Sequence, residues 1–190
     1  MHTRPGVDIA GPQHIARAVA LVALLFVGLA AGQSRAPRFD SAHPPQAGDE
    51  GVFYGPLVRV KDGDSLVAKV QGVAMEIRLA EIDSPELNQP YGRDAKQALA
   101  SLASGRQLVI MPLDTDRYGR TVAHVWNGAV HLNTEMVKRG AAWFYSEYAR
   151  SATLYEVEQE ARSAKRGLWA LPLKERIEPW LWREQARARN

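Results

Sequence analysis

Residues 60–86 read VKDGDSLVAKVQGVAMEIRLAEIDSPE and contain the strands on which the fold depends. Residues 65–70 alternate between apolar and polar side chains, a pattern that predicts a half-buried strand. Gln71-Gly72 predicts a tight turn, and residues 74–82 predict the strand that follows it. A short apolar strand is expected before them, at residues 57–60. The stretch therefore predicts an antiparallel sheet built from hairpins.

The next segment predicts a helix followed by a strand. Apolar residues recur at helical spacing from Ala95 to Leu102, with Asp94 expected as the N-cap and Gly105 as the stop. Residues 107–111 then predict a further strand.

A hairpin and two more helices are expected beyond residue 120. Asn127-Gly128 is a strong signal for a type I′ turn, and it joins predicted strands at residues 121–126 and 129–131. Asn133 is expected to cap a helix that ends near Gly140, and Ser151 to cap one that ends near Gly167.

These elements predict an α+β fold, namely a five-stranded OB-type β-barrel with three α-helices covering its end. The segment that follows the last predicted helix contains Pro172 and Pro179. We expect it to wrap the domain in extended form, with Trp180 and Trp182 as anchors.

The chain divides into four predicted parts. Residues 1–32 contain basic residues, a 15-residue apolar run and small residues, which is the layout of a secretory signal peptide. An uncleaved N-terminal anchor is the alternative, although the run is shorter than the ~20 residues of a spanning helix. Residues 33–51 predict a flexible linker, residues 52–170 the folded domain, and residues 171–190 a basic extension. Export to the periplasm or the medium is therefore expected.

Composition excludes some chemistry and leaves other chemistry open. The 190 residues are 46% hydrophobic and 24% charged, an ordinary globular balance. There is no cysteine, which excludes thiolate metal sites, thiol nucleophiles and disulfides, and the five histidines lack metal-ligand spacing. The formal charge of +3 is small, but eight bases and three acids fall in residues 162–190. That arm could follow phosphates or could be a solvated tail.

Two acidic segments are candidates for binding a cation. Asp62-Gly63-Asp64 lies between two predicted strands, and by itself it is more often only a turn. Asp83-Ser84-Pro85-Glu86 is more specific, because Pro85 stiffens a turn that carries two carboxylates and a free carbonyl at Ser84. Mixed oxygen ligands of this kind suit Ca²⁺, whereas the alternative is a capped strand end with a solvated Glu86.

Two arginines accompany these acids. Arg78 lies on the strand before Asp83, on the face opposite its apolar neighbours, and Arg120 ends the tight turn Asp116-Arg-Tyr-Gly-Arg120. Each alone could be a surface charge. Together with the acids they favour phosphodiester cleavage, because guanidiniums bind phosphate oxygens bidentately and stabilise growing negative charge.

In five motifs the chain closely resembles the staphylococcal nuclease (thermonuclease) family. The motifs are Val60-Lys-Asp-Gly-Asp64-Ser65, Ile77-Arg78-Leu with Ile82-Asp83-Ser84-Pro85-Glu86, Tyr91-Gly92, Asp116-Arg-Tyr118-Gly-Arg120 and Arg166-Gly-Leu-Trp169. The resemblance implies an OB-type barrel that hydrolyses DNA and RNA with calcium and leaves 3′-phosphates. We also expect a monomer that has no obligate protein partner and prefers single-stranded substrate.

The resemblance assigns a role to each matching residue. Asp64, Asp83 and the carbonyl of Ser84 match the calcium ligands, and Asp62 matches an acid near the ion. Glu86 matches the residue usually cast as the general base.

The remaining matches concern the substrate. Arg78 and Arg120 match the phosphate-binding arginines, and Tyr118, Tyr145 and Tyr148 match nucleotide-facing aromatics. The loop after Gly140 is shorter than in the type protein, as is the loop after Glu86, and serines replace common threonines at two positions.

Two other classes of function compete with a nuclease. An OB barrel can bind single strands without cutting them, and a calcium-stabilised domain can be purely structural. The presence of Glu86 together with both arginines argues against the first, and both arginines argue against the second.

Overall fold

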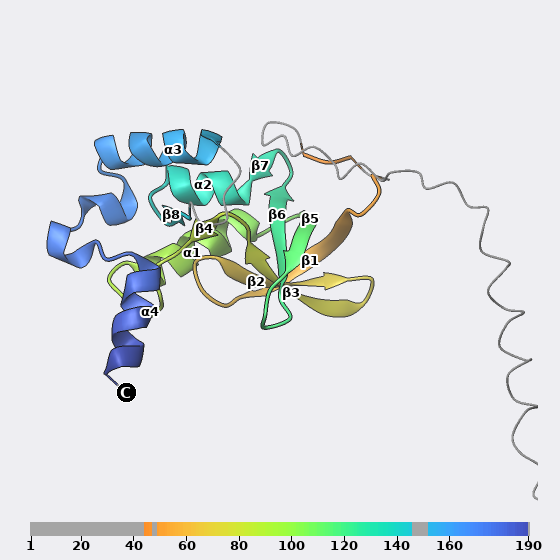
Figure 1. The fold of residues 1–190 in the computed structure, drawn as a ribbon. Helices are drawn as coiled ribbons and strands as arrows, with labels where there is room; N and C mark the ends of the chain where they lie inside the picture. The colour runs from red at the N-terminus through yellow and green to blue at the C-terminus, as the bar shows by residue number, and fades with distance from the viewer. Residues whose placement is uncertain (1–43, 47–48, 146–151, 190) are drawn as a thin grey trace, which may run out of the picture. The chain divides into compact units, whose positions relative to one another are not determined.

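The computed structural model describes residues 44–46, 49–145 and 152–189, all of which belong to one compact unit that extends from Phe39 to Asn190 (Figure 1). The predicted signal peptide and most of the predicted linker lie outside these residues. No helix of the described part is both long and apolar enough to cross a membrane. The strands of this part are β1 (Phe53–Val60), β2 (Ser65–Val70), β3 (Val73–Leu79), β4 (Ile82–Asp83), β5 (Gln107–Thr115), β6 (Thr121–Asn127), β7 (Val130–His131) and β8 (Trp143–Phe144). Its helices are α1 (Gly92–Ala103), α2 (Leu132–Lys138), α3 (Ala152–Ser163) and α4 (Pro179–Ala188), with short 3₁₀ turns at Gly167–Ala170 and Leu173–Glu175.

Five strands close into a barrel. Their order is β3-β2-β1-β5-β6, every neighbouring pair is antiparallel, and β3 pairs with β6 in parallel to complete the ring. Closure removes the exposed strand edges that an open sheet of this size would present to solvent. The predicted five-stranded barrel is therefore confirmed.

The core fills the barrel and the space beneath the helices. Its largest fully buried side chains come from barrel strands and helices alike, including Leu66, Ile77, Leu99, Ile110 and Met136. Figure 1 shows α2 and α3 side by side next to the barrel, and α1 also packs against α2. Burying a leucine or isoleucine of this kind contributes roughly 1.5–3 kcal/mol, so this shared core holds the barrel end in place.

The third predicted strand is shorter than expected. It ends at Leu79, and Glu81 then adopts a left-handed backbone with φ 62° before the two-residue strand β4 begins at Ile82. This break directs β4 away from the barrel, where it pairs with β8 instead. Asp83 is thereby carried out of the sheet to the barrel end.

Two predicted helix caps are wrong. The first helix begins two residues before Asp94, which lies in its first turn, and Tyr91 is the N-cap residue. Asn133 lies inside α2, after the N-cap residue His131, and its side chain bonds into the barrel. Ser151, the expected cap of α3, lies outside the described residues.

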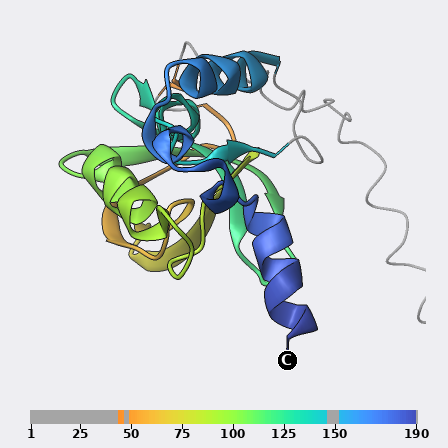
Figure 2. The ribbon, with the colours of Figure 1, turned by 90° about the vertical axis from the view of Figure 1, so that its left-hand side faces the viewer.

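The last segment ends in the helix α4, drawn in dark blue in Figure 2, so the expectation of an extended wrap is wrong. Pro179 occupies the first turn of α4, where its missing N–H costs no hydrogen bond and its fixed φ favours the helix. The helix count therefore rises from the predicted three to four within the described residues. The expected anchors do engage, because Trp180 packs against the cluster that contains Trp143 and Trp169.

Candidate active site

The turn before β2 brings Asp64 to the barrel end. Its Oδ1 accepts a hydrogen bond from Ser65 Oγ at 3.0 Å, and its Oδ2 accepts one from the backbone N–H of Ser84 at 2.8 Å. A Cβ on Gly63 would lie 2.6 Å from the Ser84 Cβ and 2.8 Å from the Ala95 Cβ. Glycine is therefore required at the centre of this turn, since only its absent side chain lets the two acidic segments meet.

Asp83 and Ser84 form the second side of the site. The Asp83 carboxyl is buried at the end of β4, and the Ser84 side chain donates to the Ala141 carbonyl at 3.1 Å. The hydroxyl of Ser84 is thus engaged with the core. The resemblance assigns the Ser84 carbonyl, and not its hydroxyl, to the ion. The replacement of threonine by serine at this position therefore leaves the predicted ion ligand unchanged.

One guanidinium connects the two carboxylates. The Nη1 of Arg78, on β3, lies 3.3 Å from Asp64 Oδ2, and its Nη2 donates to Asp83 Oδ1 at 3.0 Å. Nη1 also donates to the Leu79 carbonyl at 2.8 Å, which fixes the side chain against its own strand. Three predicted site residues, separated along the chain, therefore lie within one another's reach.

Glu86 lies beside Asp83 but is held by a residue that the sequence did not indicate. Arg183 of α4 donates from Nη1 to Glu86 Oε1 at 2.8 Å and from Nη2 to Asp83 Oδ2 at 2.7 Å. Burial lowers the pKa of Arg183, but the hydrogen bonds and charges of the two carboxylates raise it to a net value above its usual range. Arg183 is therefore a fixed positive charge at the centre of the predicted site.

Arg120 reaches the site from the β5–β6 turn. Its Nε donates to Asp116 Oδ2 at 2.7 Å, and its NH1 donates to Ser65 Oγ at 3.1 Å. Because Ser65 in turn donates to Asp64, a chain of hydrogen bonds connects Arg120 with the acidic cluster. The Tyr118 side chain is 70% exposed, and its ring centroid lies 5.6 Å from the Arg120 guanidinium carbon and 5.0 Å from that of Arg117.

The acids of this cluster are crowded. Burial, and then the neighbouring Asp64 carboxylate, raise the pKa of Asp62 to about 6. Burial also raises the pKa of Asp83, a change that the hydrogen bond from Arg183 opposes and the charge of Asp64 reinforces. Crowded carboxylates of this kind favour the binding of a further cation.

The donor set fits a hard divalent ion. Asp64 and Asp83 are two buried carboxylates joined by one guanidinium, and Asp64 also accepts a hydrogen bond from the backbone N–H of Ser84, the residue after Asp83. In the described part of the chain no three His, Cys, Asp or Glu side chains gather as a metal site. The predicted site requires only two carboxylates and a carbonyl, and oxygen ligands are those that Ca²⁺ and Mg²⁺ take.

Two predicted aromatic contacts have different outcomes. Tyr145 follows β8, and its ring stacks on Trp180 of α4 at a centroid distance of 5.1 Å. Its role toward a nucleotide stays a prediction. Tyr148 lies outside the described residues.

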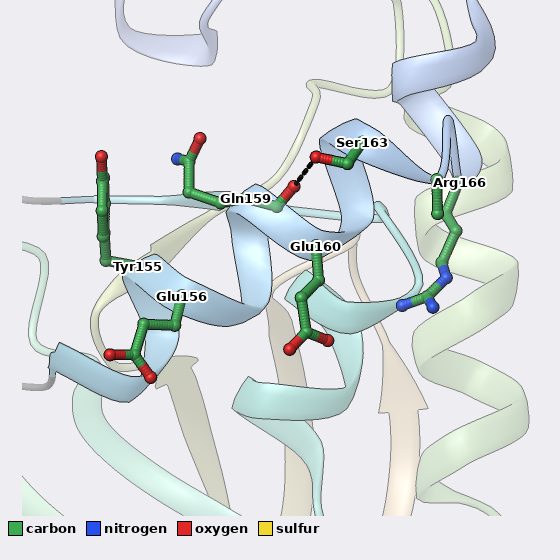
Figure 3. A pocket seen from close by; sticks show the side chains of 7 residues that line it. Tyr155, Glu156, Gln159, Glu160, Ser163 and Arg166 are labelled. Carbon is green, nitrogen blue, oxygen red and sulfur yellow. Dashed lines mark hydrogen bonds between the residues drawn. The ribbon is translucent and has the colours of Figure 1, made fainter.

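A shallow hollow on α3 is not part of this site (Figure 3). It is lined by α3 side chains such as Tyr155 and Glu160 together with Arg166, and by none of the predicted catalytic residues. The dashed line in Figure 3 is a helix-internal bond from Ser163 Oγ to the Gln159 carbonyl. The hollow is therefore separate from the predicted site at the barrel end.

Comparison with known proteins identifies the family. The staphylococcal nuclease homologue family matches residues 76–171. The chain belongs to this family. It is 38% identical to Protein ParB of Escherichia coli over 147 residues, which cover 72% of this chain and 82% of that protein. It is also 36% identical to a micrococcal nuclease of Shigella flexneri over 146 residues, 71% of this chain and 83% of that protein. An uncharacterized endonuclease of Escherichia coli O157:H7 is 38% identical over 134 residues, 70% of this chain and 86% of that protein.

Membership of the staphylococcal nuclease family confirms the predicted resemblance and agrees with the observed barrel. Arg183 and Gly63 are the site residues whose importance the sequence alone did not reveal. For Gly63 a signal existed, since a glycine between two aspartates is a turn residue, but its close approach to Ser84 is a tertiary feature. For Arg183 the partners are 97 and 100 residues away, so no local pattern indicated them.

Proposed function

We propose that this chain is an exported, calcium-dependent endonuclease that hydrolyses DNA and RNA without strong sequence specificity and leaves 3′-phosphates. One observation carries the proposal. Arg78 binds two buried carboxylates at a barrel end, and Glu86 lies directly beside them.

The class of the enzyme, a nuclease and therefore a hydrolase, follows from the family and the relatives. The family is that of staphylococcal nuclease homologues. Two relatives that are 36% and 38% identical to this chain over the aligned residues are called micrococcal nuclease and endonuclease. Nucleic acid is accordingly the substrate. The calcium requirement, the product ends and export are the finer parts of the proposal.

The residues of the chain divide the reaction among them. Arg78 and Arg120 bind the scissile phosphate and neutralise the charge that grows on its non-bridging oxygens. Glu86 accepts a proton from a water molecule whose oxygen attacks phosphorus. The bond from phosphorus to the 5′-oxygen then breaks, that oxygen takes up a proton from solvent, and the phosphate stays on the 3′ side.

Asp64, Asp83 and the Ser84 carbonyl would hold the ion. When bound, a calcium ion supplies positive charge to the phosphate and makes a nearby water more acidic. The protein's contribution is to hold the two carboxylates close together, because Arg78 contacts both of them and the Ser84 N–H donates to Asp64.

Weak sequence specificity has a structural rationale. Tyr118 presents a largely exposed ring beside Arg120 and Arg117. Stacking on an aromatic ring is tolerant of sequence because every base has a flat face, and splayed bases favour single strands. We propose a monomer that needs no protein partner, with Tyr145 and Tyr148 as further nucleotide contacts.

The location is proposed from the first 32 residues. Their basic start, apolar run and small-residue end indicate export to the periplasm or the medium, with an N-terminal anchor as the alternative. Mass determination of the protein recovered from culture medium, periplasm and membranes distinguishes cleavage from anchoring. A mature form that begins near Gln33 supports export, and a full-length membrane-bound form supports the anchor.

Digestion of end-labelled single-stranded DNA by the purified full chain tests the proposal. Cutting in calcium and no cutting in a calcium chelator is the expected result, with 3′-phosphate ends on the fragments. The Glu86→Gln variant should lose most of this activity and still bind DNA. Binding without cutting in any divalent ion would instead favour a non-catalytic binding module.

A further inference from the structure

The C-terminal helix α4 reaches the proposed catalytic groups and engages them. Its Arg183 donates to both Asp83 oxygens, at 3.2 Å and 2.7 Å, and to Glu86 Oε1 at 2.8 Å. Only Asp83 is deeply buried, and about a third of the Arg183 and Glu86 side chains stays exposed. The guanidinium therefore covers the acids from the solvent side.

The position of α4 does not depend on Arg183 alone. Trp180 stacks on Tyr145 at 5.1 Å and meets Trp143 edge-on at 6.1 Å. Trp182 donates from its indole N–H to Asn88 Oδ1 at 3.3 Å. These contacts dock the first turn of α4 on the domain.

The segment that leads into α4 is also attached beside Glu86. Gln89 donates to the Ile177 carbonyl and accepts from the Glu86 N–H at 3.1 Å. Trp180 and Arg183 are three residues apart and so lie on neighbouring positions of one helix face. Docking of the aromatic residue consequently presents the arginine to the acids.

This arrangement conflicts with a cation at the same carboxylates. Oxygen ligands lie about 2.3–2.6 Å from a calcium ion. A guanidinium nitrogen of Arg183 already lies 2.7 Å from Asp83 Oδ2, so an ion bound to Asp83 would compete with Arg183 for the same carboxylate. Two positive groups a few ångströms apart repel each other strongly where solvent is partly excluded. Glu86 in the same state is a hydrogen-bond acceptor for Arg183 and so is less available to take a proton from water.

We propose that α4 is an autoinhibitory element whose Arg183 competes with calcium for Asp83 and restrains Glu86 until the ion displaces it. The inference rests on the proposed function, because it gives these two acids their roles at the ion and the water. Coupling of this kind is reciprocal, so whatever loosens α4 strengthens calcium binding, and calcium loosens α4.

Calorimetric titration of the full chain with calcium chloride alone tests the competition. Arg183→Gln should bind calcium about tenfold more tightly than the wild type, since loss of a charge-assisted hydrogen bond of ~1.5 kcal/mol corresponds to about that factor. Arg187→Gln is the matched control, because Arg187 is an exposed arginine one turn further along the same helix face. It should bind calcium as the wild type does.

A second variant separates the helix from the arginine. Trp180→Ala removes the stacking on Tyr145 and leaves Arg183 in place, and it should also bind calcium more tightly, because α4 then docks less often. Hydrogen exchange of the backbone amides in residues 180–188 should become faster in wild-type protein when calcium is added. Neither readout depends on catalysis.

The outcomes distinguish this inference from the proposed function. Unchanged calcium affinity in Arg183→Gln, in a protein that cuts DNA with calcium, would overturn the competition and leave the nuclease standing. Lower activity at unchanged affinity would also overturn it and would make Arg183 a substrate contact. If wild-type protein neither bound calcium nor cut DNA, both proposals would fail together.

Discussion

Two buried polar clusters in this molecule are satisfied in different ways. At the β6–β7–α2 corner, neutral side chains form hydrogen bonds with one another. The distance is 3.2 Å between His124 Nδ1 and His131 Nε2, and 2.7 Å between His131 Nδ1 and Thr134 Oγ1. At the barrel end, the three acids Asp64, Asp83 and Glu86 face only two arginines, Arg78 and Arg183. We call these the neutral cluster and the charged cluster. From this difference we propose that the neutral cluster serves stability and that the charged cluster receives a cation and a phosphate.

The chemistry of the two histidines supports this division. Burial lowers the pKa of His124 to about 4, and burial together with the charge of His124 lowers the pKa of His131 to about 3. Both rings are therefore neutral at ordinary pH, and they need hydrogen-bond partners and not counter-charges. Asn133 adds to the same cluster by donating to the Ala80 and Ala123 carbonyls and accepting from the Val125 N–H.

The largest expected effect concerns the charged cluster. Arg120→Ala should lower kcat by 10²–10³-fold, or ~3–4 kcal/mol, which is typical for the loss of one donor to a developing anion. The free energy of unfolding should change by only about 1 kcal/mol, because the pair with Asp116 is partly exposed and a single hydrogen bond to the buried Ser65 hydroxyl is lost. Single-turnover cleavage and urea denaturation measure the two effects. Arg106→Ala is the control, since Arg106 is an exposed arginine just before β5. An equal loss of kcat in that variant would contradict a specific role for Arg120.

The neutral cluster should show the opposite behaviour. Asn133→Ala leaves the buried Ala80 and Ala123 carbonyls and the Val125 N–H without the hydrogen bonds that Asn133 makes to them. It should therefore lower the free energy of unfolding by about 2–3 kcal/mol. The activity of each folded molecule should be retained. Denaturation and activity titrated against the folded fraction check this, with Gln97→Ala on the exposed side of α1 as control. A proportionate loss of kcat would mean that the two clusters are not independent.

Some of this contrast was readable from the sequence, and some was not. Alternating strands and turn residues predicted the barrel, and the spacing of Asp83, Ser84 and Glu86 predicted a stiff acidic turn. The same local reasoning failed for Asn133, because a helix-start residue that turns inward depends on the barrel it faces. A helical α4 was missed because Pro179 can either break a helix or begin one.

A smaller effect follows from the lowered histidine pKa values. Each folded-state pKa lies below the unfolded value of ~6.5, so the unfolded chain binds protons first as pH falls. The stability that each histidine contributes is therefore complete above about pH 6.5 and is lost as pH falls toward its folded-state pKa, about 4 for His124 and about 3 for His131. Between pH 7.5 and 5 the loss should be about 2 kcal/mol per histidine.

Unfolding free energies measured across this range test the histidine contribution. Between pH 7.5 and 5, the free energy of unfolding of His131→Gln should fall by about 2 kcal/mol less than that of the wild type. This difference should hold whatever the stability of the variant at pH 7.5. Groups elsewhere in the chain titrate equally in both proteins and cancel in the difference. Identical slopes in the two proteins would contradict the assignment.

The smallest effect is expected outside both clusters. Glu135 on α2 and Arg139 at the C-terminal end of that helix form a partly exposed pair at 2.8 Å. Glu135→Gln should cost only about 0.3–0.5 kcal/mol, because water and salt screen such pairs. Denaturation at low and high salt checks this value. A cost above ~1 kcal/mol would show that burial is not what separates the two clusters from the surface.

The central claim is that the charged cluster is built to receive a divalent cation. Differential scanning calorimetry of the full chain in calcium and in a chelator, for wild type and Asp64→Asn, tests it most directly. Calcium at about 100 times its Kd should stabilise the wild type by ~2.7 kcal/mol and raise its Tm by several degrees. Asp64→Asn should melt at one temperature in both solutions. Equal wild-type Tm values with calcium and chelator, or an undiminished calcium effect in Asp64→Asn, would contradict the account.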